Sequence, residues 1–351
     1  MKNGVNVAGV SELMHEIRED NTQGVFAYDA EAQWTGGDTL LAFVNAALIG
    51  SVKSARNFQW RITLNDEASV SSVCAKEMVF TPEELALTGL GSCALLTMVK
   101  GATTQGRNIQ SLKFSVTGKH YLKNDDHPAL LTDFDYRVDF DAESPEDNLL
   151  FSEILKKLSH HSPNHRTIVE SNPVTVSGTD LVIDELVSVT AVGDAKELFV
   201  ELDWEYGFQL MVKYPDRVRY TRVDQPKQGG GIDRGANPQE ILMSAFAACL
   251  TRTFVNLAEE QQITLNGLKV RTTGLVDMRG MLGIDPDVPS KLQEINAIFD
   301  VDTPADDVLV NQIILQSIEQ SPITRLLIEP QSVNLHLHRH SAQILEFVSK
   351  G

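Results

Sequence analysis

An internal repeat is the feature that most constrains how this chain folds. Residues 81–118 match residues 237–274 without a gap. The identical positions in this match include Pro82 with Pro238, Glu84 with Glu240, Cys93 with Cys249, and Thr97 with Thr253. A second stretch, residues 143–176, resembles residues 302–335. Matching segments of this length indicate one folding unit that occurs twice.

The repeat also predicts the domain organisation. The chain has 351 residues, which is too long for one typical domain. We expect one unit over residues 1–177 and a second over residues 178–351. No low-complexity linker separates the two units, so we expect them to pack on each other.

Both units contain signals for the same order of elements. Thr81-Pro-Glu-Glu84 and Asn237-Pro-Gln-Glu240 each place an N-cap residue before a proline, with a glutamate at the third helical position. The small and apolar residues that follow predict a long, buried central helix. A second helix is expected to start at Ser144-Pro145 in the first unit and at Thr303-Pro304 in the second.

Alternating apolar residues predict strands on both sides of each central helix. The predicted strands are 27–34, 59–64, 112–116, 134–140 and 174–176 in the first unit, and 198–204, 217–223, 268–271, 295–301 and 333–337 in the second. In each unit, more than one strand precedes the central helix, so strands and helices do not alternate as they do in a parallel βαβ arrangement. The fold class is therefore predicted to be α+β, with mostly antiparallel sheets.

The charge and composition of the chain limit the classes of binding partner that we expect. Thirty basic and 48 acidic side chains give a net charge of −18, which disfavours nucleic acid and anionic membranes. No signal peptide or membrane span is apparent, so a soluble cytoplasmic protein is expected. Three cysteines are too few for a disulfide scaffold. His336, His338 and His340 alternate without a carboxylate or cysteine nearby, so no metal site is predicted, and no cofactor motif is present.

Both units resemble the OsmC/Ohr family of thiol-dependent hydroperoxide reductases. The resemblance rests on the Pro-x-Glu segments, the small apolar residues and the cysteine that follow, and a second helix ending in Pro-x-x-Arg. The stretch GLVDMRGMLGI at 274–284 also resembles one branch of the family. The resemblance implies intertwined homodimers with sites where the subunits meet. In this chain it implies a pseudo-dimer within one molecule, with a further homodimer left open.

The family's chemistry implies a reactive cysteine on the central helix. Its thiolate attacks the O–O bond of an organic hydroperoxide and becomes a sulfenic acid. Cys93 and Cys249 match this thiol, and Glu83 matches the glutamate that holds an activating arginine. The corresponding residue of the second unit is Gln239, which puts Cys249 in doubt. Arg61 is the candidate arginine for Cys93.

The remaining candidates are less direct. Arg222 is the candidate arginine for the second unit. An unbroken helix separates Glu83 from Cys93 by about 15 Å, so a shared site requires a bridging side chain or a helix break. Gly89 and Gly91 permit such a break.

Family members that recycle through an internal disulfide carry a second cysteine, which resolves the sulfenic acid, before the proline of the second helix. This chain has no cysteine at that position in either unit. Ser162 and Ser321 occupy that position, and a hydroxyl cannot form the disulfide. We therefore expect an external thiol reductant, unless Cys74 reaches the site. Three alternatives stay open: buried cysteines that only pack the core, a binding protein for a small apolar or sulfur-bearing ligand, and a hydrolase using Ser162 with a neighbouring histidine.

Overall fold

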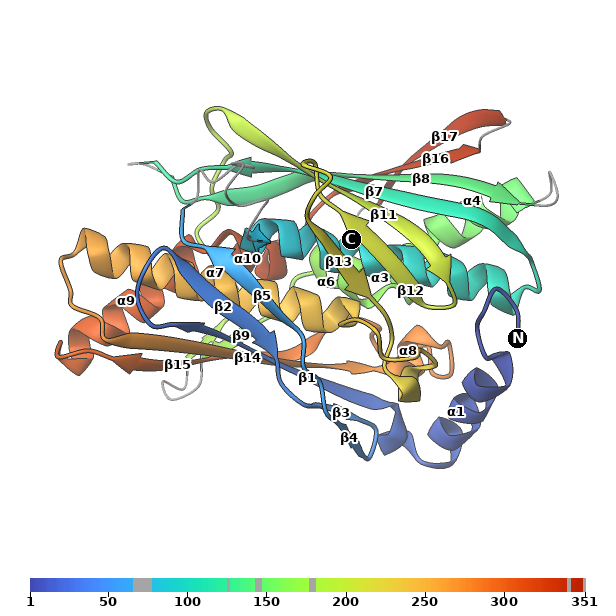
Figure 1. Cartoon of the computed structure of the whole chain (residues 1–351), viewed down its shortest axis with the longest axis horizontal. Helices are drawn as coiled ribbons and strands as arrows, with labels where there is room; N and C mark the ends of the chain where they lie inside the picture. The colour runs from blue at the N-terminus through green and yellow to red at the C-terminus, as the bar shows by residue number, and fades with distance from the viewer. Residues whose placement is uncertain (66–77, 125–126, 143–146, 177–180, 340–341, 350–351) are drawn as a thin grey trace.

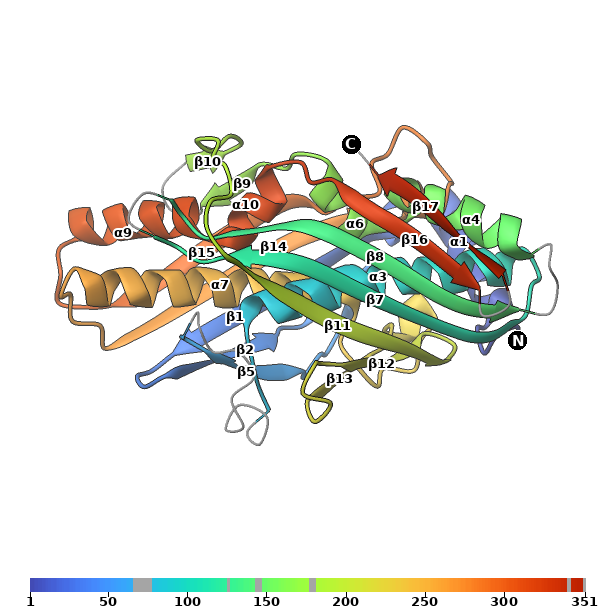
Figure 2. The same cartoon turned by 90° about the horizontal axis from the view of Figure 1, so that it is seen from above.

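The computed structural model describes residues 1–65, 78–124, 127–142, 147–176, 181–339 and 342–349. In this part of the chain, two long helices lie between two sheets (Figure 1). These helices are α3 (Pro82–Thr104) and α7 (Pro238–Glu260), which lie side by side along the molecule (Figure 2). The predicted α+β class, with long buried central helices, is confirmed.

The central helices begin as their sequences predict. Thr81 and Asn237 each accept a hydrogen bond from the third helical residue, and Glu84 and Glu240 bond back to the cap backbone. Nearly all side chains of both helices are buried. The helices pass a length and hydropathy test for membrane spans, but 89% of each tested window is buried inside the fold. They are therefore core helices.

The first sheet combines strands from both repeats. Its strands in spatial order are β10 (Leu181–Ile183), β9 (Val174–Val176), β15 (Gln293–Asp302), β14 (Gly267–Asp277), β1 (Val25–Trp34), β2 (Thr39–Val44), β5 (Gln59–Thr63) and β6 (Val79–Phe80), with β3 (Ala47–Ile49) pairing β1 and β4 (Val52–Ser54) pairing β3. Buried and less buried residues alternate along β1, as expected for a strand with one face on the core.

The second sheet is built in the same way. Its strands in spatial order are β13 (Tyr220–Val223), β12 (Gln209–Lys213), β11 (Ala195–Tyr206), β7 (Ile109–Tyr121), β8 (Leu130–Ala142), β16 (Val333–Arg339) and β17 (Ala342–Ser349). Most of the pairings are antiparallel, as predicted.

Strand exchange interlaces the two repeats. β1 of the first repeat pairs with β14 of the second, and β11 of the second pairs with β7 of the first. The strand that follows the short helices of each repeat also crosses over, because β9 pairs in parallel with β15, and β16 pairs in parallel with β8. Each sheet therefore requires both halves of the chain, which is the intramolecular form of an intertwined dimer.

The shorter helices pack around the central pair. They are α1 (Val7–Glu19), η1 (Asn21–Gly24), α4 (Asp147–Lys156), α5 (Leu158–His161), α6 (Pro163–Val169), η2 (Lys227–Gly229), α8 (Met278–Met281), α9 (Asp307–Gln320) and α10 (Pro322–Ile328). The prediction of a helix start at Thr303 is wrong: α9 begins later, because Asp306 accepts the capping hydrogen bond. Ser144 lies outside the described residues. Ser162 and Ser321 start new short helices.

Candidate functional site

Cys93 lies in the middle of α3, and three hydrogen-bond donors point at its sulfur. The Ser162 hydroxyl lies 3.2 Å from Sγ, and the Asn164 backbone N–H and the Gln239 side-chain amide each lie at 3.4 Å. Ser162 and Asn164 belong to the start of α6, whereas Gln239 belongs to the first turn of α7. The site therefore forms where the two repeats meet.

The side chain of Asn164 holds these elements together. Its amide donates to the carbonyl oxygens of Gly89 on α3 and Pro238 on α7, both at 2.9 Å. Asn164 and Ser162 are fully buried. The donors around Cys93 are thus fixed in place before any ligand arrives, which favours a negative charge on the sulfur.

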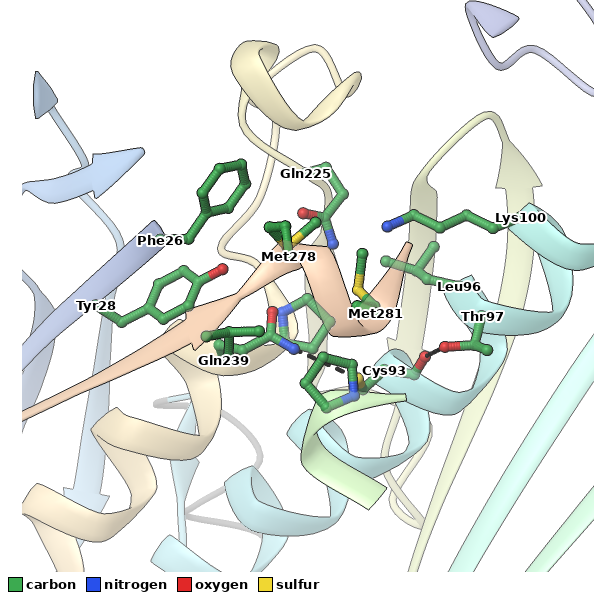
Figure 3. Close-up of a pocket in the computed structure, with 13 residues that line it drawn as sticks. Phe26, Tyr28, Cys93, Leu96, Thr97, Lys100, Gln225, Gln239, Met278 and Met281 are labelled. Atoms are coloured by element: carbon green, nitrogen blue, oxygen red, sulfur yellow. Dashed lines mark hydrogen bonds between the residues drawn. The ribbon is translucent and has the colours of Figure 1, made fainter. Parts of the chain in front are cut away.

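Cys93 lines a small pocket, shown in Figure 3. The cavity measures about 20 Å³, which is room for roughly one water molecule. Its polar walls are Tyr28, Lys100, Gln225 and Gln239, and its apolar walls include Phe26, Leu96, Met278 and Met281. Cys93 as a whole residue is only 4% exposed.

A larger apolar chamber adjoins this pocket. It measures about 410 Å³ and shares Thr97, Lys100 and Met281 with the pocket at Cys93. The N-terminal helix α1 forms part of its wall through Val10 and Met14. The chamber offers space for an apolar group that the small pocket cannot hold.

Lys100 is the cation of this site. It lies on the same face of α3 as Cys93, two turns further on, and Figure 3 shows its ammonium turned into the pocket. Burial lowers the pKa of Lys100 to about 8, and the Cys93 thiolate opposes that shift. Burial raises the pKa of the Cys93 thiol, while hydrogen bonds from Ser162 and Asn164 and the charge of Lys100 lower it without offsetting the burial.

Cys249 lies in the equivalent position on α7, in a different environment. The Ser321 hydroxyl donates to its sulfur at 3.2 Å, as Ser162 does at Cys93. Arg252 lies one turn further along α7, and its guanidinium forms a bidentate ion pair with Glu83. Cys249 is fully buried, and burial raises the pKa of its thiol to about 11 although Arg252 lowers it. Arg252 influences the sulfur through its charge, but Cys249 is sealed from solvent.

Glu83 therefore lies near the opposite cysteine from the one predicted. α3 runs unbroken from Pro82 to Thr104, so the helix break that Gly89 and Gly91 would permit does not occur. The start of each central helix instead reaches the middle of the other. Glu83 lies with Arg252 near Cys249, and Gln239 lies at Cys93. The replacement of a glutamate by Gln239 therefore changes the surroundings of Cys93, and not those of Cys249 as the sequence predicted.

The structure does not place Arg61 or Arg222 at a sulfur. Both are exposed residues, on β5 and β13, and both line a hollow that shares no residue with the Cys93 pocket. Cys74 lies outside the described residues. Sequence reasoning missed Lys100, although its spacing from Cys93 along a helix was a usable signal.

The geometry also bears on the predictions for serine and histidine. Ser162 donates its hydroxyl to Cys93 and is fully buried, an arrangement that does not support a hydrolase nucleophile. His165 is buried, which lowers its pKa to about 4. His336 and His338 bond to Asp135 and Asp139 of β8, at 3.0 and 2.8 Å.

Comparison with known proteins identifies the family. The model of OsmC-like proteins matches residues 75–177 and 229–336, more than half of the chain, so the chain belongs to this family as a tandem duplication. Solved structures similar to it include an organic hydroperoxide resistance protein OsmC from Legionella pneumophila, with 16% identity, a TM-score of 0.32, and coverage of 40% of this chain and 93% of that one. Another is an OsmC-like protein from Mycoplasma pneumoniae, with 21% identity, a TM-score of 0.30, and coverage of 37% and 88%. No curated protein matched the sequence.

Proposed function

We propose that this protein reduces organic hydroperoxides with Cys93 as the reacting thiol. The observation that carries the proposal is the convergence of three hydrogen-bond donors and one lysine around a cysteine that lines a pocket. Donors aimed at a sulfur stabilise its thiolate, which is the nucleophilic form. Cys249 lacks an opening to solvent and serves as a core residue.

The reaction transfers two electrons from sulfur to oxygen. The Cys93 thiolate attacks the terminal oxygen of the hydroperoxide, so an S–O bond forms and the O–O bond breaks. The products are a cysteine sulfenic acid and an alkoxide, which takes up one proton to become the alcohol. Lys100 is positioned to supply that proton, because a pKa of about 8 lets its ammonium donate near neutral pH.

Recycling requires thiols from outside the chain. A first external thiol condenses with the sulfenic acid, releases water and leaves a mixed disulfide on Cys93. A second external thiol attacks that disulfide, restores the Cys93 thiol and leaves as an external disulfide. Ser162 occupies the position of a resolving cysteine and cannot take this role. A reducing compartment, such as the cytoplasm, supplies such thiols.

The experiment exposes the reduced protein to cumene hydroperoxide and follows intact mass and dimedone labelling. We expect one oxygen atom to be added within minutes and peptide mapping to place dimedone on Cys93. The Cys93→Ser variant loses the reaction, whereas the matched Cys249→Ser variant keeps it. Absence of labelling on Cys93 over minutes rejects the peroxidase.

A second candidate function is the binding of an apolar ligand without chemistry. The raised thiol pKa and the 410 Å³ chamber beside the pocket favour it. It predicts saturable binding of a fluorescent apolar probe such as cis-parinaric acid, unchanged in Cys93→Ser and weakened by Val10→Asp in the chamber wall. Under this alternative the protein remains unreactive toward the hydroperoxide.

A further inference from the structure

A second hollow lies between β5 and β13, apart from the Cys93 pocket. It measures about 610 Å³, and none of its lining residues contributes to the cysteine site. Three arginines line it: Arg61, Arg222 and Arg234. Aromatic side chains form further walls: Phe58, Trp60, Phe80 and Tyr220. A concentration of guanidinium groups is unexpected on a chain whose net charge is −18.

The hollow lies where equivalent strands of the two repeats meet. Trp60 of β5 donates its indole N–H to the Thr221 hydroxyl of β13 at 3.3 Å, so the two strands are held together. Arg61 and Arg222 directly follow these two residues in sequence. On both strands the arginine is exposed and its neighbours are buried, so the two repeats present matched arginines to one opening.

Buried ion pairs make the walls rigid. Arg56 forms a bidentate pair with Glu240 and also donates to the Gly235 carbonyl oxygen at 3.0 Å. Arg219 pairs in the same way with Glu84, and its guanidinium lies 5.4 Å from the centre of the Phe80 ring. Gly235 and Phe80 both line the hollow. These pairs fix the walls of the hollow.

We propose that this hollow binds a small organic anion, with a phosphate or carboxylate attached to a flat aromatic body. Guanidinium groups bind both anions through paired N–H donors, and the exposed ring of Tyr220 stacks against a flat ligand, whereas Trp60 and Phe80 are buried within the wall. Arg222 also contacts Glu205 at 3.3 Å, an exposed pair that an anionic ligand displaces at low cost. The anionic group and the aromatic body of the ligand are both buried only where β5 of the first repeat meets β13 of the second.

The test uses Trp60 as an internal reporter of binding by phenyl phosphate, benzoate and inorganic phosphate. We expect saturable quenching by phenyl phosphate or by benzoate, and the tighter of the two identifies the anionic group. Arg61→Gln and Arg222→Gln each weaken it about tenfold. Arg137→Gln, which removes an exposed arginine from the outer face of β8, leaves it unchanged. Trp60→Phe abolishes the signal while calorimetry still detects binding.

Two results overturn the assignment. One is equal binding by the wild type and the Arg61→Gln/Arg222→Gln double variant. The other is equal affinity for inorganic phosphate and phenyl phosphate, which removes the role of the aromatic walls. Cys93→Ser retains binding, so failure of the peroxidase and failure of this site are separate outcomes.

Discussion

At the scale of single residues, the two repeats have diverged at the start and middle of their central helices. Near Cys249, Glu83 and Arg252 form a buried ion pair. Glu83 aligns with Gln239, which lies at Cys93, and Arg252 aligns with Leu96, which lines the Cys93 pocket. A buried ion pair in one copy is thus replaced by a neutral pair in the other. The second pair therefore shows which neutral residues the fold accepts at these two positions.

The first prediction concerns this ion pair. Arg252→Leu leaves the Glu83 carboxylate buried without its main partner and lowers the free energy of unfolding by about 3–5 kcal/mol. The double variant Glu83→Gln/Arg252→Leu copies the neutral pair of the other repeat and stays within about 2 kcal/mol of the wild type. Urea denaturation measures both. A double variant as unstable as the single one contradicts the argument.

The same pair predicts a dependence on pH. Burial raises the pKa of Glu83, but the charges of Arg252 and His120 outweigh burial and bring it to about 2. A carboxylate with a lowered pKa stabilises the fold fully above its unfolded pKa of 4.5 and loses that contribution as pH falls toward 2. Acid titration of unfolding should therefore show a smaller loss between pH 4.5 and 2 in the Glu83→Gln/Arg252→Leu variant than in the wild type.

The role of Lys100 gives a further prediction at this scale. Lys100→Met slows the alkylation of Cys93 by iodoacetamide at pH 8 by roughly three- to tenfold, because a partly buried charge beside the thiolate is lost. Lys100→Arg preserves most of the rate. Peptide mass spectrometry separates Cys93 from the other cysteines. Equal rates in Lys100→Met and wild type show that the lysine has no influence on the thiol.

Unfolding of the same variant provides the control for a merely structural role. Because burial lowers the pKa of Lys100 to about 8, its charged form destabilises the fold below that pH. The destabilisation disappears as pH rises toward the unfolded value of 10.5. Lys100→Met should therefore be more stable than wild type at pH 7, by a margin that decreases above pH 8.

At the scale of elements, the contact between α3 and α7 decides where the site lies. A methyl group placed on Gly89 would lie 3.0 Å from the Pro238 carbonyl oxygen and 3.1 Å from the Leu242 nitrogen. Both of these atoms belong to the backbone of α7. Gly89 is present for this close approach, and the approach brings Gln239 to Cys93.

The element-scale prediction follows from that contact. Gly89→Val separates α3 from α7 and lowers the free energy of unfolding by about 1–3 kcal/mol. It also slows hydroperoxide reduction, because Gln239 moves away from the sulfur. Glu259→Val, at the exposed end of α7, controls for the introduction of a β-branched side chain into a central helix. A Gly89→Val protein with wild-type stability in urea denaturation contradicts the close contact.

At the scale of the whole molecule, strand exchange makes the two halves dependent on each other. Residues 1–177 alone lack β14 as the partner of β1 and β11 as the partner of β7. Unpaired strand edges and uncovered core surface follow, which favour association. The full chain, in contrast, keeps these pairings within one molecule.

The whole-molecule prediction is that neither half folds as a monomer. Residues 1–177 and residues 178–351, expressed separately, should be unfolded or self-associated by circular dichroism and light scattering. The full chain should unfold in a single transition, since both sheets contain strands of both halves. A compact, folded monomer of either half contradicts the interlaced core.

The sequence by itself determined the local elements and their duplication. The capping residues Thr81 and Asn237, the apolar helices after them and the alternation in β1 depend on neighbours close in the chain, so sequence patterns were enough to predict them. The sequence patterns also identified Cys93 and Cys249 as the candidate reacting residues. Only the tertiary structure decided which groups surround each sulfur, because the first turn of each central helix lies against the middle of the other. Glu83 therefore lies with Arg252 near Cys249 and not at Cys93, and Lys100 supplies the charge at Cys93.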